Sequence, residues 1–345
     1  MSNTFGINFR VTTWGESHGE AIGLVIDGIP SNFEIDLDNI RHYLNLRRPG
    51  SSNLVSTRNE SDEFEILSGI FNNKTTGAPI SIIIKNKDVK SQDYDYLYDK
   101  FRPGHADYTY SAKYGNYDYK GGGRASARET VCRVIAGSIA RQILKEQYNI
   151  EIYAELVSIM GINSDGFQNT KRDNRLFTTD TSIISIWDDL IQKVRKDGDS
   201  AAGKVRVIAY NMPEGIGEPL ASKLDAQIAA GMMSIPGVKS VTIGNENVLY
   251  MKGSEYNDQM TSTGYLSNNA GGTLGGISNG NNLDISVTFK PTSTIIKPQQ
   301  TIDINRNNVT IQNRGRHDPC IAIRGVVIVE SILALIIIDL LNKGK

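Results

Sequence analysis

The chain has 345 residues, enough for one large domain or two modest ones with a sizeable apolar core. Its 37 lysine and arginine residues nearly balance its 38 aspartate and glutamate residues. This net charge of −1 argues against a protein that coats nucleic acid with a broad basic surface. Two cysteines, Cys132 and Cys320, are too few for a disulfide framework and fit a reducing cytoplasm. Residues 1–10 lack the basic and apolar segments of a secretory signal.

Hydrophobic periodicity predicts alternating strands and helices in the first half of the chain. Runs of β-branched residues indicate strands, whereas apolar residues three and four positions apart indicate helices that bury one face. The expected elements are strands at residues 7–13, 21–27 and 81–85 and helices at residues 36–46 and 126–148. Small residues on the last helix, Ala136, Gly137 and Ala140, predict very close packing against a neighbour.

The second half of the chain continues this alternation. The expected elements are helices at residues 183–196, 222–233 and 326–341 and strands at residues 204–210 and 238–243. The apolar stretch 326–341 contains Glu330, Ser331 and Asp339 and is shorter than the ~20 residues that a bilayer needs. We therefore expect a buried C-terminal helix and no membrane partner. Because no linker rich in proline or serine divides the chain, one composite α+β domain over residues 1–345 is favoured.

Residues 121–130, Gly-Gly-Gly-Arg-Ala-Ser-Ala-Arg-Glu-Thr, combine a flexible turn with the start of a helix. The glycines let a ligand approach the backbone closely, and Ser126 and Glu129 have the spacing of a capping box. Arg124 and Arg128 flank this start, so guanidinium groups and free N–H groups predict an anion site. The alternative is a surface helix with ordinary solvated arginines.

Three of the four histidines lie in loops rich in glycine, proline, arginine or aspartate. These are His18, His105 and His317, whereas His42 lies on a predicted helix as a surface or packing residue. Histidine titrates near neutral pH, so the three loops are candidates for acid–base catalysis. No two histidines have helical i, i+4 spacing and neither cysteine belongs to a CxxC motif, so the pattern does not predict a metal site.

Ser17 is an alternative source of chemistry, because residues 15–19 match the Gly-x-Ser-x-Gly pattern of a nucleophile elbow. Such an elbow needs a strand before it and a helix after it. A strand is expected to follow from Ala21, and this disfavours a serine hydrolase.

Arginines and glycines recur in the remaining loops. Arginines in these loops, several of them beside glycine or proline, could bind carboxylate or phosphate groups as bidentate forks; they include Arg47, Arg48, Arg58, Arg314, Arg316 and Arg324. The glycine-rich segment 269–280 has neither the Lys-Ser/Thr of a P-loop nor Rossmann spacing. Together with residues 290–294 it fits a phosphate or a flat ring against the backbone, and a flexible loop is the alternative.

Four segments together resemble the chorismate synthase family. They are Gly-Glu-Ser-His-Gly at 15–19, Arg-Pro-Gly-His-Ala-Asp at 102–107, Gly-Gly-Arg-Ala-Ser-Ala-Arg-Glu-Thr at 122–130 and Gly-Arg-His-Asp-Pro-Cys at 315–320. The motifs occur in the family's order, and the resemblance covers nearly the whole chain. It implies an α+β fold, a single-domain β-α-β sandwich with helices packed between antiparallel or mixed sheets, and a homotetramer.

The resemblance also implies a reaction and its partners. The family's lyase converts 5-enolpyruvylshikimate 3-phosphate to chorismate and phosphate, the last step of the shikimate pathway in aromatic amino acid biosynthesis. This 1,4-anti elimination requires reduced FMN (FMNH2) without net redox change. A separate flavin reductase is implied, because the chain has no spare length for a fused one.

Site roles follow from the resemblance residue by residue. His18 would protonate the leaving phosphate, His105 would stabilise the reduced flavin anion, and Asp318 would assist proton movement near the flavin. The residues implied to bind substrate are Arg47, Arg48, Arg102, Arg128 and Arg324. The residues implied to contact flavin are Arg124, Ala125, Ser126, Pro236, Gly237, Gly275, Gly276, Lys290, Pro291, Thr292, Ser293, Thr294 and Arg316.

The chain departs from the family at one place, and two other functions stay open. Many relatives carry a further arginine after residues 48–50, where this chain has Ser51-Ser52-Asn53. Either Arg58 compensates or the contact is absent. A flavin-dependent oxidoreductase would consume one reductant per product, and a non-catalytic phosphometabolite-binding protein would keep ligand affinity without His18 and His105.

Overall fold

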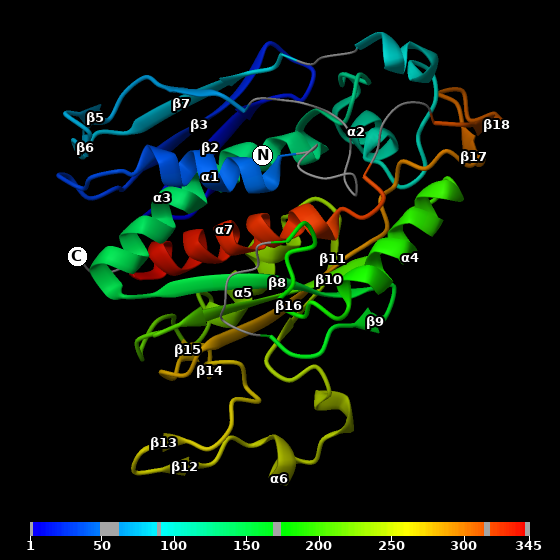
Figure 1. The fold of residues 1–345 in the computed structure, drawn as a ribbon. Helices are drawn as coiled ribbons and strands as arrows, with labels where there is room; N and C mark the ends of the chain where they lie inside the picture. The colour runs from blue at the N-terminus through cyan, green and yellow to red at the C-terminus, as the bar shows by residue number, and fades with distance from the viewer. Residues whose placement is uncertain (1–2, 49–61, 88–90, 168–173, 314–317, 342–345) are drawn as a thin grey trace.

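In a computed structural model of the chain, two five-stranded antiparallel sheets enclose a layer of helices (Figure 1). The structure describes residues 3–48, 62–87, 91–167, 174–313 and 318–341. The first sheet contains, in spatial order, β1 (Thr4–Phe5), β2 (Arg10–Gly15), β3 (Ala21–Asp27), β7 (Ile80–Lys85) and β4 (Phe64–Ile66). The second contains β11 (Val238–Ile243), β16 (Leu283–Phe289), β10 (Gly203–Tyr210), β8 (Glu151–Ile159) and β9 (Ile162–Asn163). The predicted α+β class is therefore confirmed.

Three helices form the layer between the sheets: α1 (Leu37–Arg47), α3 (Thr130–Tyr148) and α7 (Ala322–Leu341). α7 packs against α3 on one side and against β8 and β10 on the other. A Cβ atom added to Gly137 would lie 2.4 Å from the Cβ of Ser331, so these helices touch through their backbones as the small residues predict. The buried Glu330 of α7 accepts from the Ala154 N–H at 2.8 Å and pairs with Arg141 at 3.0 Å.

No helix among the described residues is long and apolar enough to cross a membrane.

The remaining elements lie outside the two large sheets and the central helix layer. The helices are α2 (Asp107–Tyr114), α4 (Ile184–Lys196), α5 (Leu224–Met233) and α6 (Gly253–Tyr256), with 3-10 turns at Ser91–Leu97, Gly123–Ala125, Ala127–Glu129 and Val248–Tyr250. The small hairpins are β5 (Ile70–Phe71) with β6 (Lys74–Thr75), β12 (Met260–Thr261) with β13 (Gly264–Tyr265), β14 (Thr273–Leu274) with β15 (Ile277–Ser278), and β17 (Gln299–Ile302) with β18 (Asn308–Ile311).

Most predicted elements are confirmed to within a few residues, and the early exceptions have identifiable causes. The strand expected from residue 7 begins only at Arg10, because the N–H groups of residues 7–9 all donate to the Asp339 carboxylate at 2.6–2.9 Å. The strand β8 and the helix α2 are not among the predicted elements. The helix expected from residue 222 begins at Leu224 (α5), with Lys223 as its N-cap, and the Gly276 carbonyl accepts the first N–H at 2.8 Å.

The capping box predicted at the start of α3 is not formed. Ser126 accepts from the N–H of Arg128 at 3.2 Å, but Glu129 does not return to the Ser126 N–H, which donates to the Gly123 carbonyl. The Glu129 carboxylate instead accepts from the Thr13 hydroxyl at 2.9 Å and pairs with Arg133 at 2.9 Å. The backbone therefore makes two 3-10 turns first, and α3 begins at Thr130.

Candidate active site

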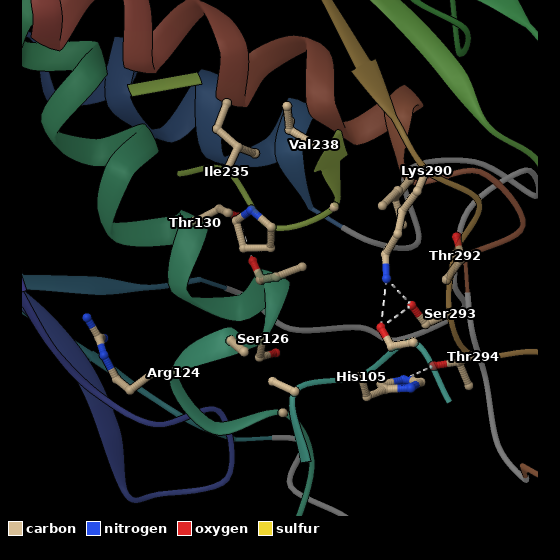
Figure 2. A pocket seen from close by; sticks show the side chains of 18 of the residues that line it. His105, Arg124, Ser126, Thr130, Ile235, Val238, Lys290, Thr292, Ser293 and Thr294 are labelled. Carbon is tan, nitrogen blue, oxygen red and sulfur yellow. Dashed lines mark hydrogen bonds between the residues drawn. The ribbon is translucent and has the colours of Figure 1, made fainter. Parts of the chain in front are cut away.

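A cavity of about 620 Å³ lies at one end of the helix layer, where α2, the start of α3 and the ends of β11 and β16 meet (Figure 2). Its volume lies within the ~300–1,000 Å³ of typical small-molecule sites. Segments far apart in the sequence form its wall. The predicted site residues that line it are Arg102, His105, Arg124, Ala125, Ser126, Pro236, Gly237, Lys290, Thr292, Ser293, Thr294, Asp318 and Arg324.

Other predicted site residues do not line this cavity: His18, Arg47, Arg48, Arg128, Pro291, Gly275 and Gly276. Gly275 and Gly276 form the turn between β14 and β15, beside the start of α5. Arg58 and Arg316 lie outside the described residues, as do Arg314 and His317. The wall of the cavity also contains residues that the sequence did not single out for this site, among them Tyr94, Tyr110, Tyr117 and Lys239.

His105 lies on the cavity wall with both ring nitrogens engaged. Its Nδ1 is 3.0 Å from the Pro103 carbonyl oxygen. Its Nε2 is 2.9 Å from the Thr294 hydroxyl (Figure 2). Burial lowers the pKa of this imidazole to about 4, and the positive charges of Arg102 and Lys290 act in the same direction. The imidazole is therefore neutral at neutral pH.

Lys290 and Ser293 bind the loop that contains His105. The Lys290 ammonium group donates to the Gly104 carbonyl at 2.7 Å and to the Ser293 hydroxyl at 2.6 Å (Figure 2). Ser293 in turn donates to the Gly104 carbonyl at 2.8 Å. The two hydrogen bonds to the Gly104 carbonyl thus join segments that are 186 and 189 residues apart in the sequence, along one edge of the cavity.

Arg102 is oriented by a neighbour from its own motif. Its Nε and Nη2 atoms each donate to the Asp107 carboxylate at 2.7 Å, and Nη2 also donates to the Gly121 carbonyl at 2.6 Å. Both side chains are almost fully buried. A bidentate pair of this kind fixes the plane of the guanidinium group as well as its charge.

His18 lies just behind the cavity wall. Its ring packs edge-on against Tyr94, with ring centroids 4.9 Å apart, and the Arg102 guanidinium lies 5.7 Å from the centre of the same tyrosine ring. A Cβ atom added to Gly121 would lie 2.4 Å from His18, so only glycine fits there. Tyr94 and Gly121 both line the cavity, and they connect His18 to the Arg102–His105 loop.

Ser17 is buried beside His18 in the turn between β2 and β3. Since a strand and not a helix follows it, the local geometry is not that of a nucleophile elbow.

Arg47 and Arg128 share the carboxylate of Asp62 behind the wall. The Asp62 carboxylate pairs with Arg47 at 2.9 Å and also with Arg128, and all three side chains are at most 6% exposed. Burial lowers the pKa of Arg47 to about 10, although Asp62 opposes this. Burial would raise the pKa of Asp62, but the two arginines lower it below its ordinary value.

The opposite cavity wall carries a second oriented arginine. Arg324 donates from Nη1 to the Asp318 carboxylate at 2.7 Å and from Nε to the Arg47 carbonyl at 2.9 Å. These bonds connect the cavity to the Asp62 cluster through the end of α1.

Arg124 reaches the cavity wall, but its guanidinium is held by the first sheet. It donates to the Thr13 hydroxyl at 2.6 Å and to the Gly15 carbonyl at 3.2 Å, and in Figure 2 it points away from Ser126 and His105.

Comparisons with known proteins decide which family this architecture represents. The chorismate synthase family model matches residues 9–341. The chain is 48% identical over 340 residues to the chorismate synthases of Francisella tularensis subsp. novicida strain U112 and subsp. tularensis strain SCHU S4, covering 98% of this chain and 96% of each relative. A crystal structure of chorismate synthase superposes with a TM-score of 0.76 at 28% identity, covering 98% of this chain and 92% of that one.

The chain belongs to the chorismate synthase family. It is a lyase that converts 5-enolpyruvylshikimate 3-phosphate to chorismate, the last step of the shikimate pathway, and reduced FMN is its cofactor. The chorismate synthase motifs in residues 102–107 and 122–127 line the cavity, and Asp318 brings the fourth motif to it.

Proposed function

We propose that the 620 Å³ cavity is the active site, with His18, His105 and Asp318 as its acid–base residues. The observation that carries this proposal is the convergence of five distant segments on one cavity with two oriented arginines. Arg102 and Arg324 lie on its wall with carboxylate partners that fix their guanidinium planes. Such preorganised donors favour the departure of an anionic leaving group.

The chemistry of the wall fits a flavin. The Thr292 hydroxyl is buried and has no hydrogen-bond partner among the described residues, so a ligand can supply one. Pro236 and Gly237 contribute backbone at the same wall, where Gly237 has a φ of +90°. Together with Ala125, Ser126 and the segment 290–294, these residues would hold the ring and its phosphate. When bound, reduced FMN supplies electron density transiently to the substrate.

The arginines and histidines divide the remaining work. Arg102 and Arg324 bind the substrate's anionic groups; Arg47, Arg48 and Arg128 support or extend that site from behind. His18 provides a proton for the departing phosphate from its place behind Tyr94 and Gly121. Asp318, held by Arg324, assists proton movement on the flavin side.

The proposal extends to the assembly and setting of the enzyme. The residues of the core form one cluster that includes both sheets, which supports a single domain over residues 1–345. A homotetramer is supported by apolar side chains on the segment between β11 and β14, where Leu249 is 87% exposed and Tyr250 is 86% exposed. A separate flavin reductase supplies FMNH2, and the enzyme acts in the cytoplasm. Light scattering of the wild type and of the double variant Leu249→Asp/Tyr250→Asp tests the tetramer.

An anaerobic assay with 5-enolpyruvylshikimate 3-phosphate and pre-reduced FMN tests the activity and its site. Chorismate and phosphate should form in equal amounts, far in excess of flavin, and neither should form with oxidised FMN. Consumption of one reductant per product would indicate an oxidoreductase, and binding without product would indicate a binding protein. His18→Ala and His105→Ala should each lower turnover by roughly 10²–10⁴-fold. Wild-type rates in both variants would remove these residues from the mechanism.

A further inference from the structure

The hydrogen bonds of His105 determine which of its nitrogens carries a proton. The Pro103 carbonyl can only accept, so the imidazole Nδ1 must donate to it across 3.0 Å in both protonation states. In the neutral ring, Nε2 is then an acceptor, and the Thr294 hydroxyl 2.9 Å away must donate to it. This tautomer is assigned from the hydrogen-bond network.

A neutral His105 held in this way has no N–H group left for a ligand. Its one ring proton is used by Pro103, and the lone pair of Nε2 is used by Thr294. Protonation at Nε2 reverses the second bond: Nε2–H donates to the Thr294 oxygen, and the hydroxyl proton of Thr294 can rotate away. The only hydrogen-bond donor that this exchange releases is therefore the hydroxyl of Thr294.

We propose that His105 acts through Thr294, a positioning residue whose hydroxyl becomes a donor toward an anionic ring ligand when Nε2 takes up a proton. The inference rests on the proposed function of the cavity. The step moves one proton, from solvent or ligand to Nε2, and involves no change of redox state.

The charges around His105 explain why a ligand controls this exchange. Arg102 and Lys290 lower the pKa of the imidazole and Asp107 raises it, while Asp318 and Arg324 pair with each other elsewhere on the cavity wall. In the ligand-free chain, burial and the two cations keep the ring neutral. An anionic ligand offsets these cations, so its binding favours the protonated ring and the freed Thr294 donor.

The contacts of Lys290 and Ser293 make Thr294 a clean target for substitution. They hold residues 290–293 against Gly104 without any contribution from Thr294. Thr294→Val should therefore remove the hydroxyl while leaving both loops docked, and Thr294→Ser should restore the donor. Thr310→Val is a matched control, because Thr310 lies on β18 and accepts from Gln300 at 3.0 Å outside the cavity.

Nitrogen-15 NMR of histidine-labelled, ligand-free protein at neutral pH tests the hydrogen bonds independently of turnover. His105, assigned with His105→Gln, should be an Nδ1–H tautomer with a hydrogen-bonded Nε2 in the wild type, Thr294→Ser and Thr310→Val. In Thr294→Val, the Nε2 resonance should move toward that of an unbonded imine nitrogen. An Nε2–H tautomer in the wild type would overturn the inference even if the enzyme is fully active.

A double-mutant cycle with pre-reduced FMN tests whether the two residues act as one unit. Thr294→Val should lower kcat by about as much as His105→Ala, roughly 10²–10⁴-fold, with most activity restored in Thr294→Ser. The double variant should be no slower than His105→Ala alone, because residues that act through one another are strongly non-additive. Losses that multiply would show that His105 and Thr294 act separately and would overturn the inference.

Discussion

Two buried clusters of arginine and aspartate lie on either side of the cavity wall, and they differ in how charge is shared. On the cavity side, Arg102 pairs with Asp107 and donates to both of its carboxylate oxygens at 2.7 Å. Behind the wall, Asp62 is shared by Arg47 and Arg128. The first arrangement fixes the plane of one guanidinium group at the cavity wall. The second gathers two guanidinium groups around one carboxylate.

The pKa directions reflect this difference. Burial lowers the pKa of Arg102, but the bidentate pair with Asp107 outweighs it, so the pKa is raised overall. Burial lowers the pKa of Arg47 to about 10 despite Asp62, and the neighbouring Arg324 and Arg128 contribute to the shift. The same residue types therefore form a bidentate pair in one cluster and share one carboxylate between two guanidinium groups in the other.

The largest expected effect is the loss of stability in Asp62→Asn. This change removes the carboxylate with which the buried Arg47 and Arg128 both pair, and breaking a buried pair typically costs about 3–5 kcal/mol. Asp27→Asn is the matched control, since the Asp27–Arg10 pair has side chains 37% and 55% exposed and should contribute only about 0–1 kcal/mol. Urea unfolding of both variants measures the difference. A free energy of unfolding for Asp62→Asn within 1 kcal/mol of the wild type would contradict the shared-anion interpretation.

A smaller, functional effect is expected in Arg102→Lys. Lysine keeps the charge but cannot form the fork with Asp107, and losing a charged hydrogen bond of about 1.5–3 kcal/mol should lower kcat/KM by roughly 10–100-fold. Arg206→Lys is the control, because Arg206 makes a similar fork with Asp284 at 2.8 Å outside the cavity. Steady-state kinetics should show a loss only in the first variant. An equal loss in both would mean that the effect is global.

The sequence predicted which residues line the cavity better than it predicted the pairing of Arg47 and Arg128 with Asp62 behind the wall. His105, Lys290 and Thr294 belong to short motifs rich in glycine and proline, and such loops bring polar groups to a site with little ambiguity. Whether an arginine faces a ligand depends on its counter-ion, and Asp62 carries no local signal that connects it to Arg128, 66 residues away. Pairings over such separations are decided by tertiary packing and not by motif.

The fold shows the same division between local and distant information. Helices such as α4 were predictable because their apolar residues repeat with helical spacing. The strand β8 alternates less clearly, because it is buried along most of its length. The missing capping box has a tertiary cause as well: Thr13 and Arg133 bind the Glu129 carboxylate that the local pattern assigned to Ser126.

A moderate effect of pH on the free energy of unfolding should distinguish the cavity wall at His105 from the Asp62 cluster. The pKa of His105 is lowered from 6.5 to about 4 in the folded chain, so the unfolded chain binds a proton at higher pH. The free energy of unfolding should therefore fall as the pH drops from 6.5 toward 4. Asp62, whose pKa is lowered from 3.8, should add its own loss only at lower pH. Denaturant unfolding at a series of pH values measures this. In His105→Gln the free energy of unfolding should fall less between pH 6.5 and pH 4 than it does in the wild type. If His105→Gln lost stability over this pH range as steeply as the wild type, the loss could not be assigned to His105.

The smallest expected effect is the reaction of the two buried thiols with an alkylating reagent. Burial raises the pKa of Cys132 to about 12 and that of Cys320 to about 11. Since the thiolate is the reactive species, neither should be modified in the native chain at neutral pH, and both should react after unfolding. Mass spectrometry of protein treated with iodoacetamide measures this. Cys132 donates to the Gly23 carbonyl of β3 at 3.4 Å and Cys320 packs beside Gly203 of β10, so labelling of either thiol in the native chain would contradict this burial.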